Sequence, residues 1–252
     1  MIMNIFQQSL MNGMVIYMSN KKKITCLGFG GVGDCFIVIL KLLECKIPLI
    51  YTHVDDSAER IKISSELLNK FNIEHNCLFV NDIRTWWYAN NKRFDKCFNV
   101  FAMGYINIPL RAYHWQPCID EGYKNPFNNN VPIKTDYVAV QVASGGQRSY
   151  KYKPVVEYTL DNYPADKVMW FGLDNEFDCK YGINYCCKLT FFEALDKIAA
   201  CKYFVGFPSV LLYWSLWNKS DCFVFVDHQG KDDLRIHKDW KKYIKYDEDI
   251  LQ

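Results

Sequence analysis

Short runs of almost wholly apolar residues alternate with helix-like segments along most of this chain. The strand-like runs are residues 24–29, 48–54, 76–80, 97–103, 137–143, 167–173, 202–207 and 221–227. Strands that are buried on both faces are apolar throughout, whereas half-exposed strands alternate apolar and polar residues. The pattern therefore predicts an α/β fold with parallel sheets that are covered by helices on both faces.

Helix signals fill the intervals between these runs. The expected helices cover residues 34–46, 57–70, 154–162, 189–201 and 208–218. The second of them follows Asp55-Asp56-Ser57, whose short oxygen-bearing side chains satisfy free backbone N–H groups at a helix start. The last residues, 240–252, are polar and predict a C-terminal helix or tail.

A proline- and asparagine-rich stretch over residues 105–134 interrupts the alternation and predicts a long connection between two domains. We expect an N-terminal extension at 1–20, a first Rossmann-like domain at 21–134 and a second at 135–252. The 252 residues are 50% apolar, which suffices for two such cores facing a cleft.

Charge and cysteine content limit the partners and the compartment. The net charge of +2 predicts neither nucleic acid nor an anionic membrane as partner. No apolar run approaches the ~20 residues that span a bilayer. The 11 cysteines lie mostly in apolar runs, and the first 17 residues lack the features of a signal peptide. We therefore expect reduced thiols, no metal site and a cytoplasmic protein.

Residues 27–34 read LGFGGVGD and place glycines at Gly28, Gly30 and Gly33, the G-x-G-x-x-G spacing of a dinucleotide-binding turn. Asp55 or Asp56, about 20 residues further on, stands where a ribose-binding acid belongs. Asp34 argues for a different use of the turn, because its negative charge repels a phosphate at the helix start. Three hypotheses follow: a pyrophosphate cradle, an acid presented to a substrate, or a helix cap.

The second half carries a small and basic loop directly after the run 137–143. Ser144 and Gly145 let a backbone approach an anion closely, and Arg148 and Lys151 add positive charge. The loop predicts a phosphate-binding site, although a flexible turn with solvated cations gives the same pattern.

Two further loops follow strand-like runs of the second half. Glu176 comes just after one of them, where a carboxylate can accept hydrogen bonds from ribose hydroxyls, although a solvated loop acid gives the same pattern. Gly206 and Ser209 lie between a strand end and a helix start, where they predict either a phosphate contact or an N-cap. Parallel strands put such loops at one sheet edge, so we expect a donor site there, opposite Asp34.

These motifs resemble the bacterial heptosyltransferases and related glycosyltransferases with the two-domain GT-B fold. In that family a first strand runs into a Gly-Asp turn, as in GVGDCF here, and the aspartate is the general base on the acceptor hydroxyl. The resemblance therefore implies that role for Asp34. Lys151-Tyr152-Lys153-Pro154 is similar to the family's Lys-x-Trp-Pro element, whose lysine contacts the donor phosphates. Glu176 in FGLDNE resembles the glutamate that follows the next strand.

The resemblance covers roughly residues 22 to 228, in a chain that is short for the family. The segment LTFFEALDKIAACKYFVGFPSVLLYWS resembles a helix and strand that lead into the family's Asp-Ser-Gly-x-x-His. Here that element reads Phe207 to Leu212, and it keeps the serine, Ser209.

The resemblance implies a shortened, divergent glycosyltransferase without a cofactor. It would move a sugar from a nucleoside-diphosphate sugar to a glycan or other acceptor hydroxyl. Arg148, Lys151 and backbone N–H groups would replace a metal, and Gly31 and Gly33 would adjoin the substrate. Two alternatives remain: an NAD(P)-binding oxidoreductase that uses Gly28 to Gly33, and an inactive protein that binds nucleotide sugars.

Overall fold

Two parallel β-sheets carry the fold, as the alternating pattern predicts. The computed structural model describes residues 24–29, 31–45, 49–83, 85, 86, 89, 98, 99, 132–143, 152–173, 177–226 and 242–247. The chain divides into two compact units, Met1–Pro126 (unit 1) and Phe127–Gln252 (unit 2). All strand pairs within the described residues are parallel, which confirms the α/β class.

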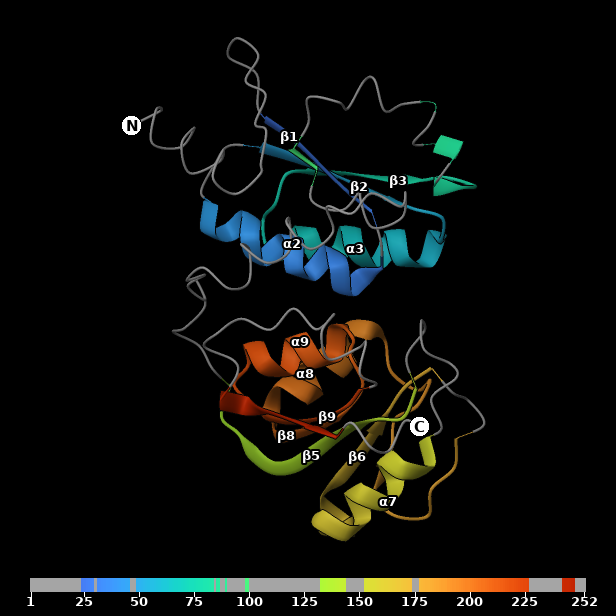
Figure 1. The fold of residues 1–252 in the computed structure, drawn as a ribbon, viewed down its shortest axis with the longest axis vertical. Helices are drawn as coiled ribbons and strands as arrows, with labels where there is room; N and C mark the ends of the chain where they lie inside the picture. The colour runs from blue at the N-terminus through green and yellow to red at the C-terminus, as the bar shows by residue number, and fades with distance from the viewer. Residues whose placement is uncertain are drawn as a thin grey trace. The chain divides into compact units, whose positions relative to one another are not determined.

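Unit 1 contains a four-stranded sheet in the order β3-β2-β1-β4. Its elements are β1 (Ile24–Phe29), α2 (Val32–Cys45), β2 (Leu49–Asp55), α3 (Ala58–Lys70), β3 (His75–Phe79) and β4 (Phe98–Asn99). Both helices lie on one face of the sheet (Figure 1). Ser57 caps α3 as expected: its hydroxyl accepts a hydrogen bond from the Arg60 amide at 3.3 Å.

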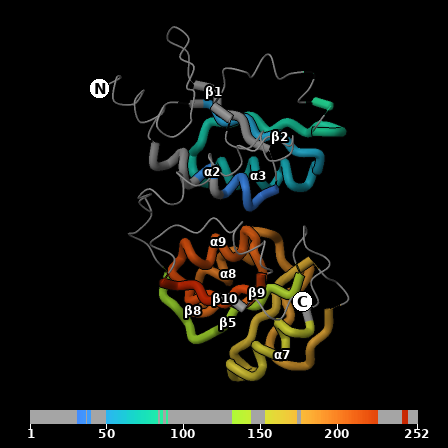
Figure 2. Tube along the Cα trace, viewed as in Figure 1, coloured from blue at the N-terminus to red at the C-terminus, as the bar shows by residue number. Residues whose placement is uncertain are grey.

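Unit 2 contains a six-stranded sheet in the order β10-β9-β8-β5-β6-β7, which can be followed in Figure 2. Its strands are β5 (Thr135–Gln141), β6 (Val168–Phe171), β7 (Ile183–Asn184), β8 (Cys201–Gly206), β9 (Asp221–Phe225) and β10 (Ile244–Asp247). Its helices are α7 (Tyr152–Asn162), a 3-10 turn at Ala165–Lys167, α8 (Phe191–Ala200) and α9 (Val210–Trp217). Helix α7 covers one face, and α8 and α9 cover the other (Figure 1).

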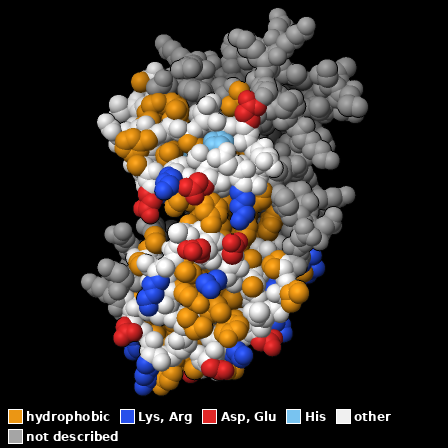
Figure 3. Space-filling model, turned by 180° about the vertical axis from the view of Figure 1, so that it is seen from behind, with side chains coloured by type: hydrophobic (Ala, Val, Ile, Leu, Met, Phe, Trp, Pro, Cys, Tyr) orange, Lys and Arg blue, Asp and Glu red, His pale blue; other side chains and the backbone are white. Residues whose placement is uncertain are grey.

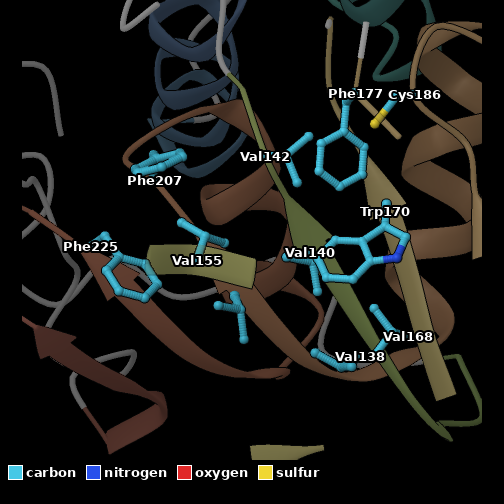
Figure 4. Packing of buried hydrophobic residues seen from close by; sticks show 11 residues of the cluster. Val138, Val140, Val142, Val155, Val168, Trp170, Phe177, Cys186, Phe207 and Phe225 are labelled. Carbon is cyan, nitrogen blue, oxygen red and sulfur yellow. The ribbon is translucent and has the colours of Figure 1, made fainter. Parts of the chain in front are cut away.

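The core between the unit 2 sheet and α7 is apolar. Figure 4 shows its close packing around the indole of Trp170. The cluster consists of Val138, Val140, Val142, Val155, Val168, Trp170, Phe177, Cys186, Val205, Phe207 and Phe225. Full burial of one large apolar side chain contributes roughly 1.5–3 kcal/mol. The packing of this cluster therefore stabilises the central strands of unit 2.

The C-terminal prediction of a helix or tail is wrong. Residues Ile244–Asp247 form the edge strand β10, which pairs with β9 from Cys222 to Phe225. Ile244 is 8% exposed, so burial of its side chain and hydrogen bonding to β9 outweigh the polar composition of the segment. Most of the predicted connection at 105–134 lies outside the described residues.

Candidate functional site

Both sheets wind outward from their first strand, and this order indicates where to look for a ligand site. In unit 1 the chain runs from β1 to β2 and β3 on one side, and β4 lies on the other side of β1. In unit 2 it runs from β5 to β6 and β7, and β8 to β10 lie on the other side. Ligands of such sheets bind at the carboxyl ends of the two strands where the direction reverses. These switch points are the ends of β1 and β4 in unit 1, and of β5 and β8 in unit 2.

The start of α2 follows the unit 1 switch point and carries Asp34. The Asp34 carboxylate accepts a hydrogen bond from the Gly31 amide at 3.0 Å, and the Cys35 amide donates to the Gly31 carbonyl at 3.1 Å. The half-buried carboxylate therefore caps the helix start, the third of the three sequence hypotheses. Gly33 is the second residue of α2 and thus part of the helix rather than of the loop.

The described residues leave room for a side chain at Gly31, the residue whose amide Asp34 binds. A Cβ atom added to Gly31 would meet no atom of the described residues within 4 Å. The hydrogen bond from the Gly31 amide is not the only interaction of Asp34. Whether this carboxylate also acts on a substrate stays a prediction.

Asp55 has the right position for a ribose-binding acid, at the end of β2, but it is fully buried. Its two carboxylate oxygens accept from Nε of Arg60 at 2.9 and 3.0 Å, and Oδ1 also accepts from Nη2 of Arg60 at 2.6 Å. The Ser57 amide donates to it at 2.9 Å. Asp55 therefore orders the turn before α3, and ribose hydroxyls do not reach it in this structure. Asp56, the alternative acid at this spacing, is exposed and paired with Arg60 at 2.7 Å, so the dinucleotide hypothesis stays a prediction.

Ser209 and Gly206 lie at the unit 2 switch point, in the turn between β8 and α9. The Ser209 hydroxyl accepts from the Leu212 amide at 3.3 Å, which makes it the N-cap of α9. The same hydroxyl donates to the Gln141 side-chain carbonyl at 2.6 Å. A Cβ at Gly206 would lie 2.8 Å from the Gln141 Cβ and 3.1 Å from the Phe204 ring. Gly206 and Ser209, which the sequence predicts as ligand residues, therefore both have structural roles in this turn.

The other predicted donor residues lie outside the described part of the chain. They are Ser144, Gly145, Arg148, Lys151 and Glu176. The structure describes what leads into their loops: Val142 and Ala143 after β5, and Gly172 and Leu173 after β6. Their role in binding a donor stays a prediction.

Sequence reasoning missed three buried or half-buried polar groups. Gln141 is 3% exposed at the end of β5, and its only sequence signal is a single amide in an apolar run. Lys134 donates through Nζ to the carbonyls of Ala199 and Cys201 at 2.7 and 3.1 Å, and to the Ser220 hydroxyl at 3.0 Å. Burial lowers the pKa of Lys134 to about 8. This lysine ties the start of unit 2 to its sheet.

His53 on β2 is the third such group. It is fully buried; its Nδ1 lies 3.1 Å from the Tyr51 hydroxyl, and its Nε2 has no partner among the described residues. Burial, together with the charges of Arg60 and His75, lowers the pKa of His53 to about 4. The imidazole is therefore neutral near pH 7.

The sequence predicts no metal site, although one of its features bears on metal binding. Asp247-Glu248-Asp249 is an Asp-x-Asp triplet, and Asp247 ends the edge strand β10, while the other two residues lie outside the described part. Within the described residues, no group of three or more His, Cys, Asp or Glu side chains is arranged to hold a metal ion.

The face of the molecule in Figure 3 is mixed in charge and hydropathy. Acidic and basic side chains are interspersed over the face shown in Figure 3, with apolar patches between them. No described helix is both long enough and apolar enough to cross a bilayer.

Comparison with known proteins gives a fold and no sequence family. No family model matches the sequence, and no curated protein matches it. The chain is similar in structure to the E. coli ADP-heptose LPS heptosyltransferase II, with 12% identity, 90% of each chain covered and a TM-score of 0.51. This likeness shows that the two proteins share a fold.

Two structures of TibC are also similar. TibC is described as an iron-containing dodecameric glycosyltransferase from enterotoxigenic E. coli; the match has 13% identity, covers 82% of this chain and 59% of TibC, and has a TM-score of 0.47. For TibC in complex with ADP-D-beta-D-heptose the values are 11%, 92%, 64% and 0.49. The chain thus spans less than two thirds of the length of TibC.

Proposed function

We propose that this protein is a glycosyltransferase that moves a sugar from a nucleoside-diphosphate sugar to an acceptor hydroxyl. Its fold is that of a heptosyltransferase whose name specifies ADP-heptose, which supports a nucleotide-sugar donor. The observation that carries the proposal is the placement of Asp34 at the unit 1 switch point, next to Gly31, where the described residues leave room for a side chain. An acid is unsuited to holding a diphosphate there, but it is suited to receiving a proton.

In the proposed reaction, Asp34 takes the proton of the acceptor hydroxyl while that oxygen bonds to the anomeric carbon. The bond from this carbon to the diphosphate breaks, and its electron pair leaves with the nucleoside diphosphate. The Gly31 amide fixes the carboxylate, so that it need not reorient during the step. General-base catalysis contributes typically ~10²–10⁴-fold.

The donor site of this proposal is the unit 2 switch point. Arg148 and Lys151 balance the charge that develops on the diphosphate, in place of a metal, and Glu176 binds the ribose hydroxyls. Ser144 and Gly145 let the backbone approach the phosphates. Gly206 and Ser209 shape the turn before α9, where the first helical N–H groups have no intrahelical acceptor.

A cytoplasmic location is part of the proposal. Seven cysteines are unpaired thiols, and four of these are buried: Cys35, Cys186, Cys201 and Cys222. Unpaired thiols in this number fit a reducing compartment.

The test is Asp34→Asn. Asparagine keeps an oxygen that accepts from the Gly31 amide but is not a base, so the fold and donor binding persist while turnover falls about 100-fold or more. Turnover is measured as release of nucleoside diphosphate from ADP-, GDP- and UDP-sugars with a panel of glycan acceptors. Asp82→Asn is the matched control, because Asp82 also accepts from a backbone amide, that of Thr85 at 3.3 Å.

Full turnover in Asp34→Asn would exclude Asp34 as the general base. Loss of folding in this variant would leave helix capping as the only supported role of Asp34. Stabilisation of the wild type by NAD(P), and by no nucleotide sugar, would exclude the transferase. Binding of nucleotide sugars without turnover would favour the second candidate, an inactive binding protein. The segment Phe207 to Leu212, which keeps only the serine of the family's motif, supports that candidate.

A further inference from the structure

The buried amide of Gln141 connects two turns that are far apart in the sequence. Its side-chain oxygen accepts from the Ser209 hydroxyl at 2.6 Å, and its Nε2 donates to the Ala143 carbonyl at 3.3 Å. Ala143 belongs to the turn after β5, and Ser209 to the turn after β8. One side chain thus bridges both turns of the unit 2 switch point.

The packing around Gln141 leaves it little freedom. Gly206 lies so close that even a methyl group there would meet the Gln141 Cβ at 2.8 Å. From the other side, Gly172 approaches the turn after β5, because a Cβ at Gly172 would lie 3.1 Å from the Ala143 nitrogen. The Val142 amide also donates to the Phe171 carbonyl at 2.9 Å. The turn after β5 is therefore held between both neighbouring strands.

The hydrogen bonds also define what Ser209 contributes. A hydroxyl has one proton, and that of Ser209 points to Gln141 while its oxygen accepts from the Leu212 amide. Ser209 therefore has no proton left for a phosphate. Its contribution is to hold the start of α9, whose first N–H groups face outward along the helix axis.

We propose that Gln141 is a positioning residue that couples the two turns, so that both meet the diphosphate of one ligand at the same time. This inference rests on the proposed binding of nucleoside diphosphates at the unit 2 switch point. It predicts that Gln141 and Ser209 act as one unit in ligand binding, although neither donates to the ligand.

The experiment is a double-mutant cycle with Gln141→Met and Ser209→Ala in the full chain. Isothermal titration calorimetry measures the affinity for ADP, GDP and UDP. Each single variant weakens the best of these ligands roughly five- to tenfold, which is the effect of one lost hydrogen bond. The double variant is no weaker than the poorer single variant, because both changes remove the same coupling. Ser209→Thr keeps the hydroxyl and retains the affinity.

Ser215→Ala is the matched control. It removes a buried serine hydroxyl from the same helix, one that bonds to the Leu211 carbonyl at 2.8 Å. It lowers the melting temperature but leaves nucleotide affinity unchanged. A purely structural role of Gln141 predicts the same behaviour for Gln141→Met.

Unchanged affinity in a folded Gln141→Met, or full additivity in the double variant, would overturn the proposal. If Gln141→Met does not fold, Ser209→Ala breaks the same bond and is judged against Ser215→Ala. If the wild type binds none of the three nucleotides, the proposed function fails, and hydrogen exchange then tests the coupling alone. Joint acceleration at the Val142 and Leu212 amides in Gln141→Met supports it, and unchanged exchange refutes it.

Discussion

The turn before α2 in unit 1 and the turn before α9 in unit 2 each follow a central strand, but they are built differently. Each has a glycine, Gly31 or Gly206, ahead of the helix and an oxygen-bearing side chain, Asp34 or Ser209, at the helix start. At Gly31 the described residues leave the space of a side chain empty, whereas at Gly206 neighbouring atoms fill it. Asp34 is held by its own turn, whereas Ser209 is held by a residue 68 positions away. A glycine in such a motif therefore indicates open space in one case and tight packing in the other.

The cores of the two units also differ, and we expect acid to destabilise unit 1 more than unit 2. His53 is buried in unit 1 with its pKa lowered from 6.5 to about 4, while the α7 side of the unit 2 sheet is apolar. Between these two pH values the unfolded chain binds a proton that the folded chain excludes. The contribution of the neutral His53 to the free energy of unfolding is therefore fully present above pH 6.5. It falls as the pH drops toward 4, by about 3 kcal/mol in total.

Hydrogen exchange can measure this effect in each unit separately. Amides of β2 should lose protection between pH 6.5 and 4 after correction for intrinsic exchange, and amides of β5 should lose less. His53→Gln removes the titrating group and should flatten the dependence in unit 1. Equal acid loss in both units would contradict the prediction.

Alanine at the two glycines should separate their roles. Gly206→Ala forces the new methyl against Gln141 and Phe204, so we expect unit 2 to lose about 1–3 kcal/mol in urea unfolding. Gly31→Ala meets no described atom, so unit 1 should lose no more than about 1 kcal/mol, the effect of a poorer N-cap residue. Its larger consequence should be reduced turnover, because the methyl occupies the space beside Asp34. Equal destabilisation by both substitutions would remove the contrast.

The smallest expected effect concerns two helix caps that lie away from the switch points. Ser57 caps α3 in unit 1, and Thr190 caps α8 in unit 2 through a capping box with Glu193. Ser57→Ala and Thr190→Ala should each cost about 1 kcal/mol in urea unfolding without a change in nucleotide affinity. A change in affinity would show that the ligand site depends on more than the two turns.

Local signals in the sequence predicted most elements of the fold. The apolar run at 24–29 and the Asp-Asp-Ser cap before α3 gave the right type of element at nearly the right bounds, because burial and capping act over a few residues. β10 was missed, because its partner β9 lies about twenty residues earlier and its own residues are polar. Pairing with another strand is decided by tertiary structure.

The candidate site was predictable only in part, for the same reason. The Gly-Asp turn lies at the unit 1 switch point, and its role in ligand binding stays a prediction. Asp55 has the expected sequence spacing, but its burial under Arg60 depends on a side chain five positions further on. The bridge from Gln141 to Ser209 joins two segments that no short-range pattern connects.

The outward winding of both sheets also affects how such a chain tolerates change. In unit 2 the first strand β5 and its switch-point neighbour β8 are central, whereas in unit 1 β1 is central and β4 lies at the edge of the described sheet. The edge strands β3, β7 and β10 carry no predicted ligand contact. Insertions or deletions at the margins therefore leave the binding geometry intact, while a single added carbon at Gly206 disturbs it. Sequence drift in this architecture should accumulate at the periphery first.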